Sequence, residues 1–347
     1  MENSETVLVT GGTGFVGVQC ILQLLQKGYA VKTTLRSIKR KDEVLDMLKN
    51  GGITAFDNLS FVEADLTKND NWYEAAKGCR YVLHVASPIF LQLPKDENEM
   101  IHPAVYGARR VLKAARNAGV KRVVMTSNFG AVGYSHKNPN TKITEEEWTN
   151  PNEKGLSSYN KSKVLAERAA WNIININKEA GNTELSVINP VAIFGPSLSP
   201  VLSSGFALLK NLIDGKMKAI PNLTMNVIDV RDVADLHIRA MTNPDAKGQR
   251  FLALAGGKIS MPQIATLLKN KMPEIAENIP AKVLPDWQIY VAALFNRQAK
   301  NAASMLRASR NVSNEKAKKI LGWQPIATNE EAIIASVESM VKFGNIK

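Results

Sequence analysis

The sequence predicts an α/β protein with a Rossmann-type, doubly wound parallel sheet and a smaller, interleaved α-rich lobe. Three observations support this prediction. Residues 6–10 form an apolar strand that runs directly into a glycine-rich turn and an amphipathic helix. Strand and helix patterns then alternate through the first half of the chain, which favours parallel strands joined by crossover helices. The strands are apolar almost throughout, as expected for strands that are buried on both faces.

The turn after the first strand carries glycines at regular intervals, at Gly11, Gly14 and Gly17. This spacing allows a tight turn, a close approach of the backbone to a ligand and close packing of the following helix. Free backbone N–H groups and the positive end of the helix dipole would favour an anionic pyrophosphate at the start of that helix. We therefore expect a dinucleotide site, lined by Gly11, Thr13, Gly14, Phe15, Val16 and Gly17.

The other elements follow from the same alternation of strand and helix patterns. The expected strands are residues 30–36, 59–66, 81–87, 122–127, 185–189 and 250–255; the expected helices are 41–49, 104–117, 158–177, 261–270, 313–321 and 330–341, with a short strand and helix over 227–239. From Pro190 to about residue 223, prolines, glycines and serines predict loops. The chain thus divides into a dinucleotide-binding part, 1–189 with about 224–256, and a substrate lobe, about 190–223 with 257–347.

The composition is that of an ordinary globular protein, with 45% hydrophobic and 22% charged residues. The N-terminus carries Glu2 and Glu5 instead of a basic leader, and no apolar run is long enough to cross a bilayer, so we expect a cytoplasmic protein without a membrane partner. The net charge of +12 comes from basic residues scattered among acidic ones, as in 39–43, which does not favour nucleic acid as a partner. Cys20 and Cys79 lack neighbours at ligand spacing, which predicts reduced core thiols and no metal site.

Arg36 closes the second predicted strand, where a dinucleotide-binding fold usually presents an acid to the adenosine ribose. An acid would bind the 2′-hydroxyl and repel a 2′-phosphate, whereas an arginine offers a forked donor and a positive charge. Ser37, Lys39 and Arg40 lie next to it. The segment therefore favours NADP(H) over NAD(H) as the cofactor, although a solvated basic loop would give the same pattern.

Tyr159 and Lys163 are four residues apart in a predicted helix, so both side chains project from one face. A phenol is normally too weak an acid for proton transfer near neutral pH, and an ammonium held close to it favours the phenolate. Tyr159 would then be able to transfer a proton. The same spacing also occurs by chance on helix surfaces, so the pair is informative together with other motifs.

Three motifs occur together: the glycine pattern at 11–17, Thr-Ser-Asn at 126–128 and the tyrosine-lysine pair at 159–163. With them the sequence resembles the extended short-chain dehydrogenase/reductases over nearly the whole chain. Within these it is most similar to the branch of dihydroflavonol reductase, cinnamoyl-CoA reductase and the microbial aldehyde or methylglyoxal reductases. Further matching segments are 64–66, 84–88, 190–196 and 229–234. The resemblance implies an NADPH-dependent carbonyl reductase.

The resemblance also implies roles for individual residues. Lys163 would bind the nicotinamide ribose, and Tyr159 would protonate the carbonyl oxygen as the hydride arrives from the nicotinamide. Other cofactor contacts would come from Asp65, Leu66, Ala86, Ser87, Pro88, Thr126, Pro190, Val191 and Ile193. The substrate pocket would be formed by Ile89, Phe90, Phe129, Tyr134, Val201 and Phe206. These segments are mainly apolar and no arginine or lysine stands at an obvious pocket position, so we expect a small, neutral aldehyde or ketone.

One position departs from the family pattern, which usually ends the fifth strand with two serines and uses the second to hydrogen-bond the substrate oxygen. Here Ser127 is followed by Asn128. Successive strand residues point to opposite faces, so Ser127 cannot replace the missing hydroxyl without a local twist. We expect the Asn128 amide to donate to the carbonyl oxygen as negative charge develops there. A bend after Thr126 would give this role to Ser127 instead.

Two other functions share parts of the pattern. A nucleotide-sugar epimerase or dehydratase has the same fold and tyrosine-lysine pair, but we would expect a retained NAD and an acid in place of Arg36. A non-catalytic, NADP-binding redox sensor would usually lack the tyrosine-lysine pair. His84 lies on the fourth strand, where a core role is favoured over that of a catalytic base. The prediction is a carbonyl reductase, either monomeric or homodimeric.

Overall fold

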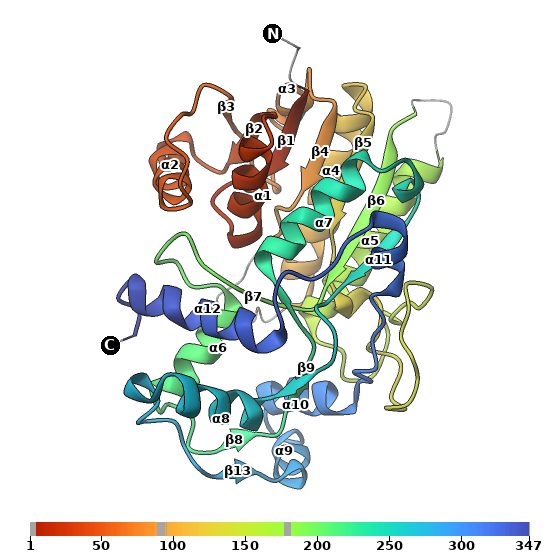
Figure 1. Cartoon of the computed structure of the whole chain (residues 1–347). Coiled ribbons are helices and arrows are strands. Elements are labelled where there is room, and N and C mark those ends of the chain that lie inside the picture. Colours follow the sequence, from red (N-terminus) through yellow and green to blue (C-terminus); the bar gives the residue numbers. More distant parts are fainter. Residues whose placement is uncertain (1–4, 89–93, 95, 177–181, 347) are drawn as a thin grey trace.

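The computed structural model describes residues 5–88, 94, 96–176 and 182–346. Its centre is a sheet of seven strands in which every neighbouring pair is parallel (Figure 1). The strands follow the order β3 (Leu59–Glu63), β2 (Ala30–Leu35), β1 (Thr6–Thr10), β4 (Tyr81–His84), β5 (Arg122–Thr126), β6 (Glu184–Pro190) and β11 (Arg250–Ala253). The predicted Rossmann-type sheet is confirmed.

The strand order reverses at β1. This strand pairs with β2 on one side and β4 on the other, so Thr10 lies opposite both Thr34 and His84. From β1 the chain continues to β2 and β3 on one side of the sheet. It then returns to form β4 on the other side of β1. In open α/β sheets such a reversal leaves a crevice at the carboxyl ends of the strands, where ligands bind.

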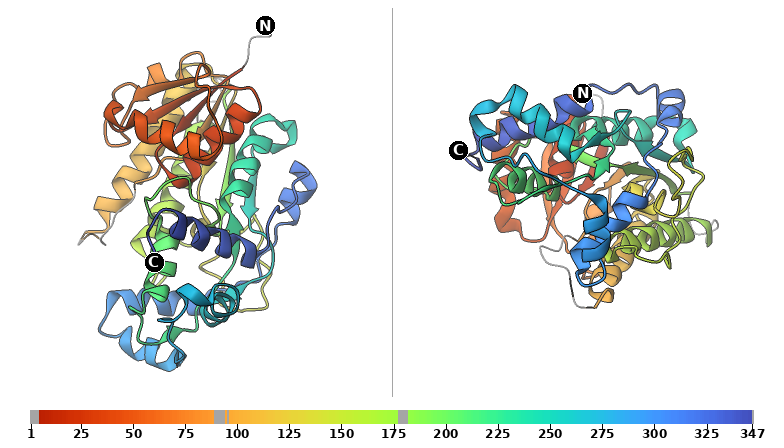
Figure 2. Two further views of the ribbon diagram at one scale, coloured as in Figure 1. Left: turned by 60° about the vertical axis from the view of Figure 1, so that its left-hand side comes forward. Right: turned by 90° about the horizontal axis from the view of Figure 1, so that it is seen from below.

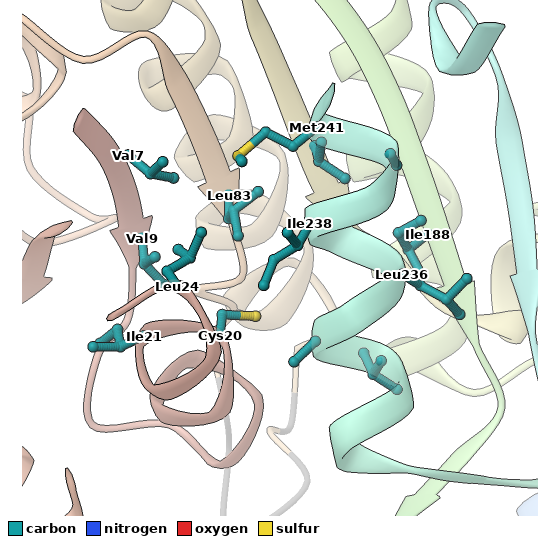
Figure 3. Close-up of a cluster of buried hydrophobic side chains, with 14 of the residues drawn as sticks. Val7, Val9, Cys20, Ile21, Leu24, Leu83, Ile188, Leu236, Ile238 and Met241 are labelled. Atoms are coloured by element: carbon teal, nitrogen blue, oxygen red, sulfur yellow. The ribbon is translucent and has the colours of Figure 1, made fainter. Parts of the chain in front are cut away.

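Side chains of β1 alternate between two hydrophobic clusters, one on each face of the sheet. Val7 and Val9 pack with α1 (Phe15–Gln26) and α7 (Val230–Thr242), as Figure 3 shows, and Leu8 packs on the opposite face. That opposite face is covered by α3 (Trp72–Ala76), α4 (Asn98–Asn117) and α5 (Ser158–Ile176), and the first face also by α2 (Lys41–Asn50) and α11 (Glu315–Leu321). Burial on both faces explains the apolar strands.

A second lobe lies at the carboxyl edge of the sheet, because β6 leads directly into β7 (Ala192–Phe194), which pairs with β10 (Val227–Asp229) (Figures 1 and 2). Its other elements are α6 (Ser204–Ile213), β8 (Ile220–Pro221), β9 (Thr224–Met225), β12 (Ile259–Ser260), α8 (Met261–Lys271), β13 (Val283–Leu284), α9 (Asp286–Ala292), α10 (Arg297–Arg307) and α12 (Asn329–Lys342). A separate hydrophobic cluster joins α6, α8 and α12. In the described part of the chain, no helix has the length and apolar character needed to span a membrane.

The structure corrects the loops that were expected over 190–223. Residues 204–213 form α6, and its Phe206, Leu209 and Leu212 side chains are buried in the core of the lobe. The prolines, glycines and serines around this segment indicated loops, so the helix was not predicted. Its stability comes from packing of its apolar face, not from local propensity. Helices α9 and α10 were not expected from the sequence either.

The two parts of the chain also interleave more than the sequence-based division implies. Ala317, Leu321 and Trp323 fall in the expected substrate lobe, yet they pack in the cluster on the sheet beside α7. Conversely, Met225 and Val227 fall in the expected dinucleotide part but pack in the cluster of the lobe. The chain crosses between the two cores several times, and the site described below lies where it crosses.

Candidate active site

The glycine turn after β1 forms a compact backbone cradle. Gly11 has a φ of 78°, a left-handed conformation that favours glycine, and its oxygen accepts a hydrogen bond from the Gly14 N–H at 2.9 Å. A Cβ atom added to Gly17 would lie 2.3 Å from the same oxygen, so the packing of turn against helix requires glycine there. Helix α1 begins at Phe15 without a side-chain cap and without an acidic residue in its first turn. Its first N–H groups therefore fit a pyrophosphate.

Arg36 is exposed directly after β2 ends, at the carboxyl edge of the sheet. Among the described residues, no carboxylate forms an ion pair with Arg36 or with the exposed Lys39. Arg40, in contrast, binds Glu43 through hydrogen bonds of 2.9 and 2.7 Å. Ser37 precedes the short helix η1 (Ile38–Arg40) without a side-chain capping bond. Arg36 and Lys39 are thus available to a phosphate, and Arg40 is engaged elsewhere.

Asp65 and Leu66 follow β3 at the same edge. The Asp65 carboxylate accepts hydrogen bonds from the N–H and the hydroxyl of Thr67, each at 2.8 Å. These bonds hold the pKa of Asp65 below its ordinary value, and the nearby charge of Arg36 adds to the effect. Leu66 lies against α4, where a Cβ atom on Gly107 would be 3.0 Å from it. Arg36 and Asp65 therefore lie near each other at the expected adenosine end of the site.

A small hydrogen-bond cluster closes the switch point between β1 and β4. The Thr10 hydroxyl oxygen accepts hydrogen bonds from the N–H groups of Val85 and Ala86, at 3.1 and 3.0 Å. Its proton is then free to donate to His84 Nδ1, 3.0 Å away. Burial, with a smaller contribution from the charge of Lys163, lowers the pKa of His84 to about 3. His84 is thus a neutral core residue that helps to shape the loop carrying Ala86.

Tyr159 and Lys163 lie on one face of α5, as their spacing predicts. The Lys163 side chain is only 7% exposed, and its Nζ donates a hydrogen bond of 2.9 Å to the Ser87 hydroxyl. The same Nζ lies 5.6 Å from the centroid of the Tyr159 ring, which is 43% exposed. A nearly buried ammonium is therefore held between the loop after β4 and a phenol that a ligand can reach. This arrangement places a positive charge beside the Tyr159 ring.

Asn128 lies beside the start of α5, the helix that carries Tyr159. A Cβ atom added to Gly130 would lie 2.6 Å from Asn128 Oδ1 and 2.3 Å from Asn160 Oδ1, so the two amides converge above Gly130. Asn128 is half-buried and its Oδ1 has no partner among the described residues. Ser127 is buried, its N–H donates to the Ile188 oxygen, and its Oγ likewise has no described partner. Both candidate side chains thus carry a buried polar atom without a described partner.

A buried polar network supports Asn128 from behind. Glu167 lies two turns beyond Tyr159 on α5 and is fully buried. Its carboxylate accepts hydrogen bonds from Arg250 Nε at 2.6 Å and from Asn189 Nδ2 at 2.8 Å. Asn189 Nδ2 also lies 3.3 Å from the Asn128 carbonyl oxygen, to which it donates. The network thus ties the catalytic helix to the ends of β5, β6 and β11.

Thr126 has a different neighbour from the one we expected. Its hydroxyl lies 2.6 Å from Nε2 of the buried His237, whose Nδ1 lies 2.7 Å from the Val233 oxygen. Burial lowers the pKa of His237 to about 4, so this imidazole is neutral. The Thr126 side chain is therefore engaged with α7, and its expected contact with the cofactor stays a prediction. Of the remaining expected cofactor residues, Pro88 follows β4, Pro190 ends β6, Val191 follows it and Ile193 lies in β7.

The residues expected in the substrate pocket are unequally placed. Ile89 and Phe90 lie outside the described residues. Phe129 and Phe206 are only 4% and 1% exposed, and the Phe206 ring packs edge-on against Phe15 at 5.2 Å. These two phenylalanines are thus core side chains with little surface for a ligand. Val201 is exposed and Tyr134 is half-buried, so both present surface to a ligand.

A basic side chain that the sequence did not indicate lies next to one segment of the expected pocket. Arg310 lies against the two aromatic residues of this segment, with its Cζ 5.5 Å from the Phe129 ring centroid and 5.6 Å from that of Tyr134. The two rings are themselves 5.8 Å apart. Sequence reasoning missed Arg310 because it is distant in the chain from Phe129 and belongs to no recognised motif.

The comparison with protein families agrees with this geometry. The 3-beta hydroxysteroid dehydrogenase/isomerase family matches residues 8–253, which include the glycine turn, the tyrosine-lysine pair and all seven strands of the central sheet. The chain belongs to the 3-beta hydroxysteroid dehydrogenase/isomerase family. The match ends where β11 ends, so most of the substrate lobe lies beyond it.

Relatives within and around this family are reductases by name. Cinnamoyl-CoA reductase CAD2 of Medicago truncatula is 31% identical over 99% of this chain and 98% of its own. An anthocyanidin reductase of Vitis vinifera is 33% identical over 78% of this chain and 82% of its own. The structure of yeast methylglyoxal/isovaleraldehyde reductase Gre2 complexed with NADPH has a TM-score of 0.81 at 27% identity, covering 98% of this chain and 99% of the other. The resemblance to this branch of reductases is confirmed.

Several functional candidates in this member of the 3-beta hydroxysteroid dehydrogenase/isomerase family were not found from the sequence. Glu167 and Asn189 carry a signal that could have been used. Glu167 continues the spacing of Tyr159 and Lys163 along one helix face, beside the buried Ala166 and Ala170. An acid on a buried helix face needs a partner, because burial of an unpaired charge is costly.

Proposed function

We propose that the chain reduces small aldehydes or ketones to alcohols with NADPH. The observation that carries the proposal is the placement of Lys163, which binds Ser87 and lies 5.6 Å from the Tyr159 ring. This pair stands at the carboxyl edge of the sheet, where the strand order reverses and a dinucleotide is expected to bind. The activities named for the relatives, NADPH-bound Gre2 among them, support the same function.

The residues of the chain fit the parts of NADPH. The free N–H groups at the start of α1 would hold the pyrophosphate. Arg36 and Lys39 would bind the 2′-phosphate, since both are exposed and neither is paired with a described carboxylate. Lys163 would reach the nicotinamide ribose from beside Ser87. When bound, NADPH supplies a hydride to the carbonyl carbon of the substrate.

The chain itself supplies the proton and stabilises the charge that develops. Tyr159 donates its phenolic proton to the carbonyl oxygen, so the substrate becomes an alcohol and the tyrosine a phenolate. The ammonium of Lys163 stabilises that phenolate electrostatically until a proton returns. Asn128 donates from its amide to the same oxygen, which acquires negative charge in the transition state. Glu167 and Asn189 hold the Asn128 backbone in place.

We also propose that the two parts of the chain bind different ligands. Residues 1–189 with about 224–256 would bind the dinucleotide, and about 190–223 with 257–347 would form the substrate side. Separate hydrophobic clusters beside the sheet and in the lobe support this division, apart from the crossings noted above.

The direct test is a panel of small aliphatic and aromatic aldehydes and activated ketones, with NADPH oxidation followed by absorbance. We expect reduction of several of them with NADPH and much weaker reduction with NADH. UDP- and dTDP-sugars serve as controls and should remain unaltered. The proposal is wrong if no carbonyl compound is reduced, or if a nucleotide-sugar is epimerised or dehydrated instead.

A further inference from the structure

Arg310 is held in place by its backbone on both sides. The Ser309 N–H donates to the His136 oxygen at 2.9 Å, and the Asn311 oxygen accepts from the Ile143 N–H at 2.8 Å. The Arg310 oxygen accepts a further hydrogen bond of 3.1 Å from Asn226 Nδ2. These hydrogen bonds therefore fix the Arg310 backbone relative to the segment that carries Phe129 and Tyr134.

The guanidinium of Arg310 has little to bind in the described part of the chain. It packs on the Phe129 and Tyr134 rings, and Nη2 makes one long hydrogen bond of 3.4 Å to the Met305 oxygen. Its Nε is buried without a partner among the described residues. No described carboxylate forms an ion pair with it. Aromatic faces attract a cation, but they leave its N–H donors unsatisfied and its charge uncompensated.

Three other arginines of this protein have carboxylate partners. Arg122 binds Glu184 at 2.6 Å, Arg231 binds Asp229 at 2.8 Å and Arg250 binds Glu167 at 2.6 Å. Each of these guanidinium groups thus has a carboxylate beside it. Arg310 has no such described carboxylate beside it, and an external anion would supply the missing charge.

The location of Arg310 indicates what that anion belongs to. Phe129 follows Asn128 directly, and its ring packs with Val191, Leu252 and Leu254 at the carboxyl ends of β6 and β11. The guanidinium therefore lies beside the segment that begins at Asn128, a residue of the proposed carbonyl site. We propose that Arg310 binds a carboxylate of the substrate, and that the preferred substrate is an aldehyde or ketone carrying a carboxylate away from the reacting carbonyl. This inference rests on the proposed function.

A carboxylate is favoured over a phosphate by charge and shape. The planar guanidinium fork matches a carboxylate through two parallel hydrogen bonds. A phosphate monoester carries close to two negative charges, and no second cation lies over either ring in the part of the chain that the structure describes. The single positive charge of the guanidinium thus balances the single negative charge of a carboxylate.

The test compares ω-oxo acids of increasing chain length with their methyl esters, using NADPH and the unmodified chain. We expect at least one acid to exceed its ester by about ten- to a hundredfold in kcat/KM, mainly through KM, as expected for a charge-assisted pair. Arg310→Met keeps the apolar stem on the rings and should bring this ratio close to one while ester reduction continues. Arg310→Lys keeps the charge but loses the fork, and should give an intermediate ratio.

Arg307→Met is the matched control. Arg307 also lies over an aromatic ring, 5.0 Å from that of Tyr290, but it is exposed and lies away from Phe129. This variant changes the net charge equally and should keep the full preference for the acid. The inference is overturned if the unmodified chain reduces esters as well as acids, or if Arg310→Met keeps the preference. Failure of the unmodified chain to reduce any acid or ester would instead contradict the proposed function.

Discussion

Replacement of Glu167 by alanine should destabilise the fold and impair the site together. The carboxylate is fully buried and binds Arg250 Nε at 2.6 Å and Asn189 Nδ2 at 2.8 Å. In Glu167→Ala, the Arg250 guanidinium stays buried with two carbonyl oxygens, those of Glu145 and Glu147, but without a carboxylate beside it. Asn189 loses one of its two partners and holds the Asn128 carbonyl less firmly.

The expected cost follows from the burial of this pair. Removing one partner of a buried ion pair typically costs about 3–5 kcal/mol, because the other charge is left uncompensated. For a chain of 347 residues, the entropy of unfolding is roughly 0.7 kcal/mol per kelvin, so the midpoint Tm should fall by about 4–7 °C. The loss would be a large share of a typical stability of about 5–15 kcal/mol.

Thermal unfolding followed by circular dichroism measures the effect, and NADPH binding shows that the variant is folded. Glu315→Ala is the matched control, because Glu315 binds Lys142 at an exposed site and its loss should leave Tm unchanged. The double variant Glu167→Ala/Arg250→Met should lose less stability than the sum of the two single variants. A fall in Tm no larger than that of Glu315→Ala would refute this account of the network.

Three further predictions concern the cofactor, the oxyanion and pH. Arg36→Ala should raise the KM for NADPH about tenfold or more without raising that for NADH, since a charged donor to the 2′-phosphate is lost; an unchanged ratio of the two KM values contradicts this. Asn128→Ala should lower kcat on the order of a hundredfold, with Asn128→Ser active and Ser127→Ala nearly unaffected; a dead Ser127→Ala beside an active Asn128→Ala reverses the assignment. His237 is neutral when folded, with a pKa of about 4 against an ordinary 6.5, so stability should fall as pH drops through this window. His237→Gln should flatten the slope, and an equally steep slope would show that other groups cause it.

The features found from the sequence are those that nearby residues determine. The glycine turn was predictable because Gly11 to Gly17 lie within one strand-turn-helix unit. The shared face of Tyr159 and Lys163 follows from helical periodicity alone. The parallel sheet was predictable because strand and helix patterns alternate along the chain. In each case, the information needed lies within a few residues.

The features that were missed depend on contacts between distant segments. Helix α6 is stabilised by burial of Phe206 against Phe15 and the core of the lobe, and not by a strong local pattern. Arg310 reaches Phe129 and Tyr134 through an isolated bridge between Ile143 and Val312, which no spacing in the sequence indicates. The substrate side is therefore harder to predict than the cofactor side, because it is assembled from more separate pieces of chain.

The central claim is that Tyr159 gives a proton to a carbonyl compound that NADPH reduces. Its most direct test is the single-turnover reduction of an aldehyde by Tyr159→Phe with NADPH prebound, measured beside the NADPH dissociation constant of the same variant. We expect reduction to be almost abolished while NADPH binding stays nearly unchanged, because the variant lacks only the proton donor. Reduction at a rate close to that of the unmodified chain would contradict the claim.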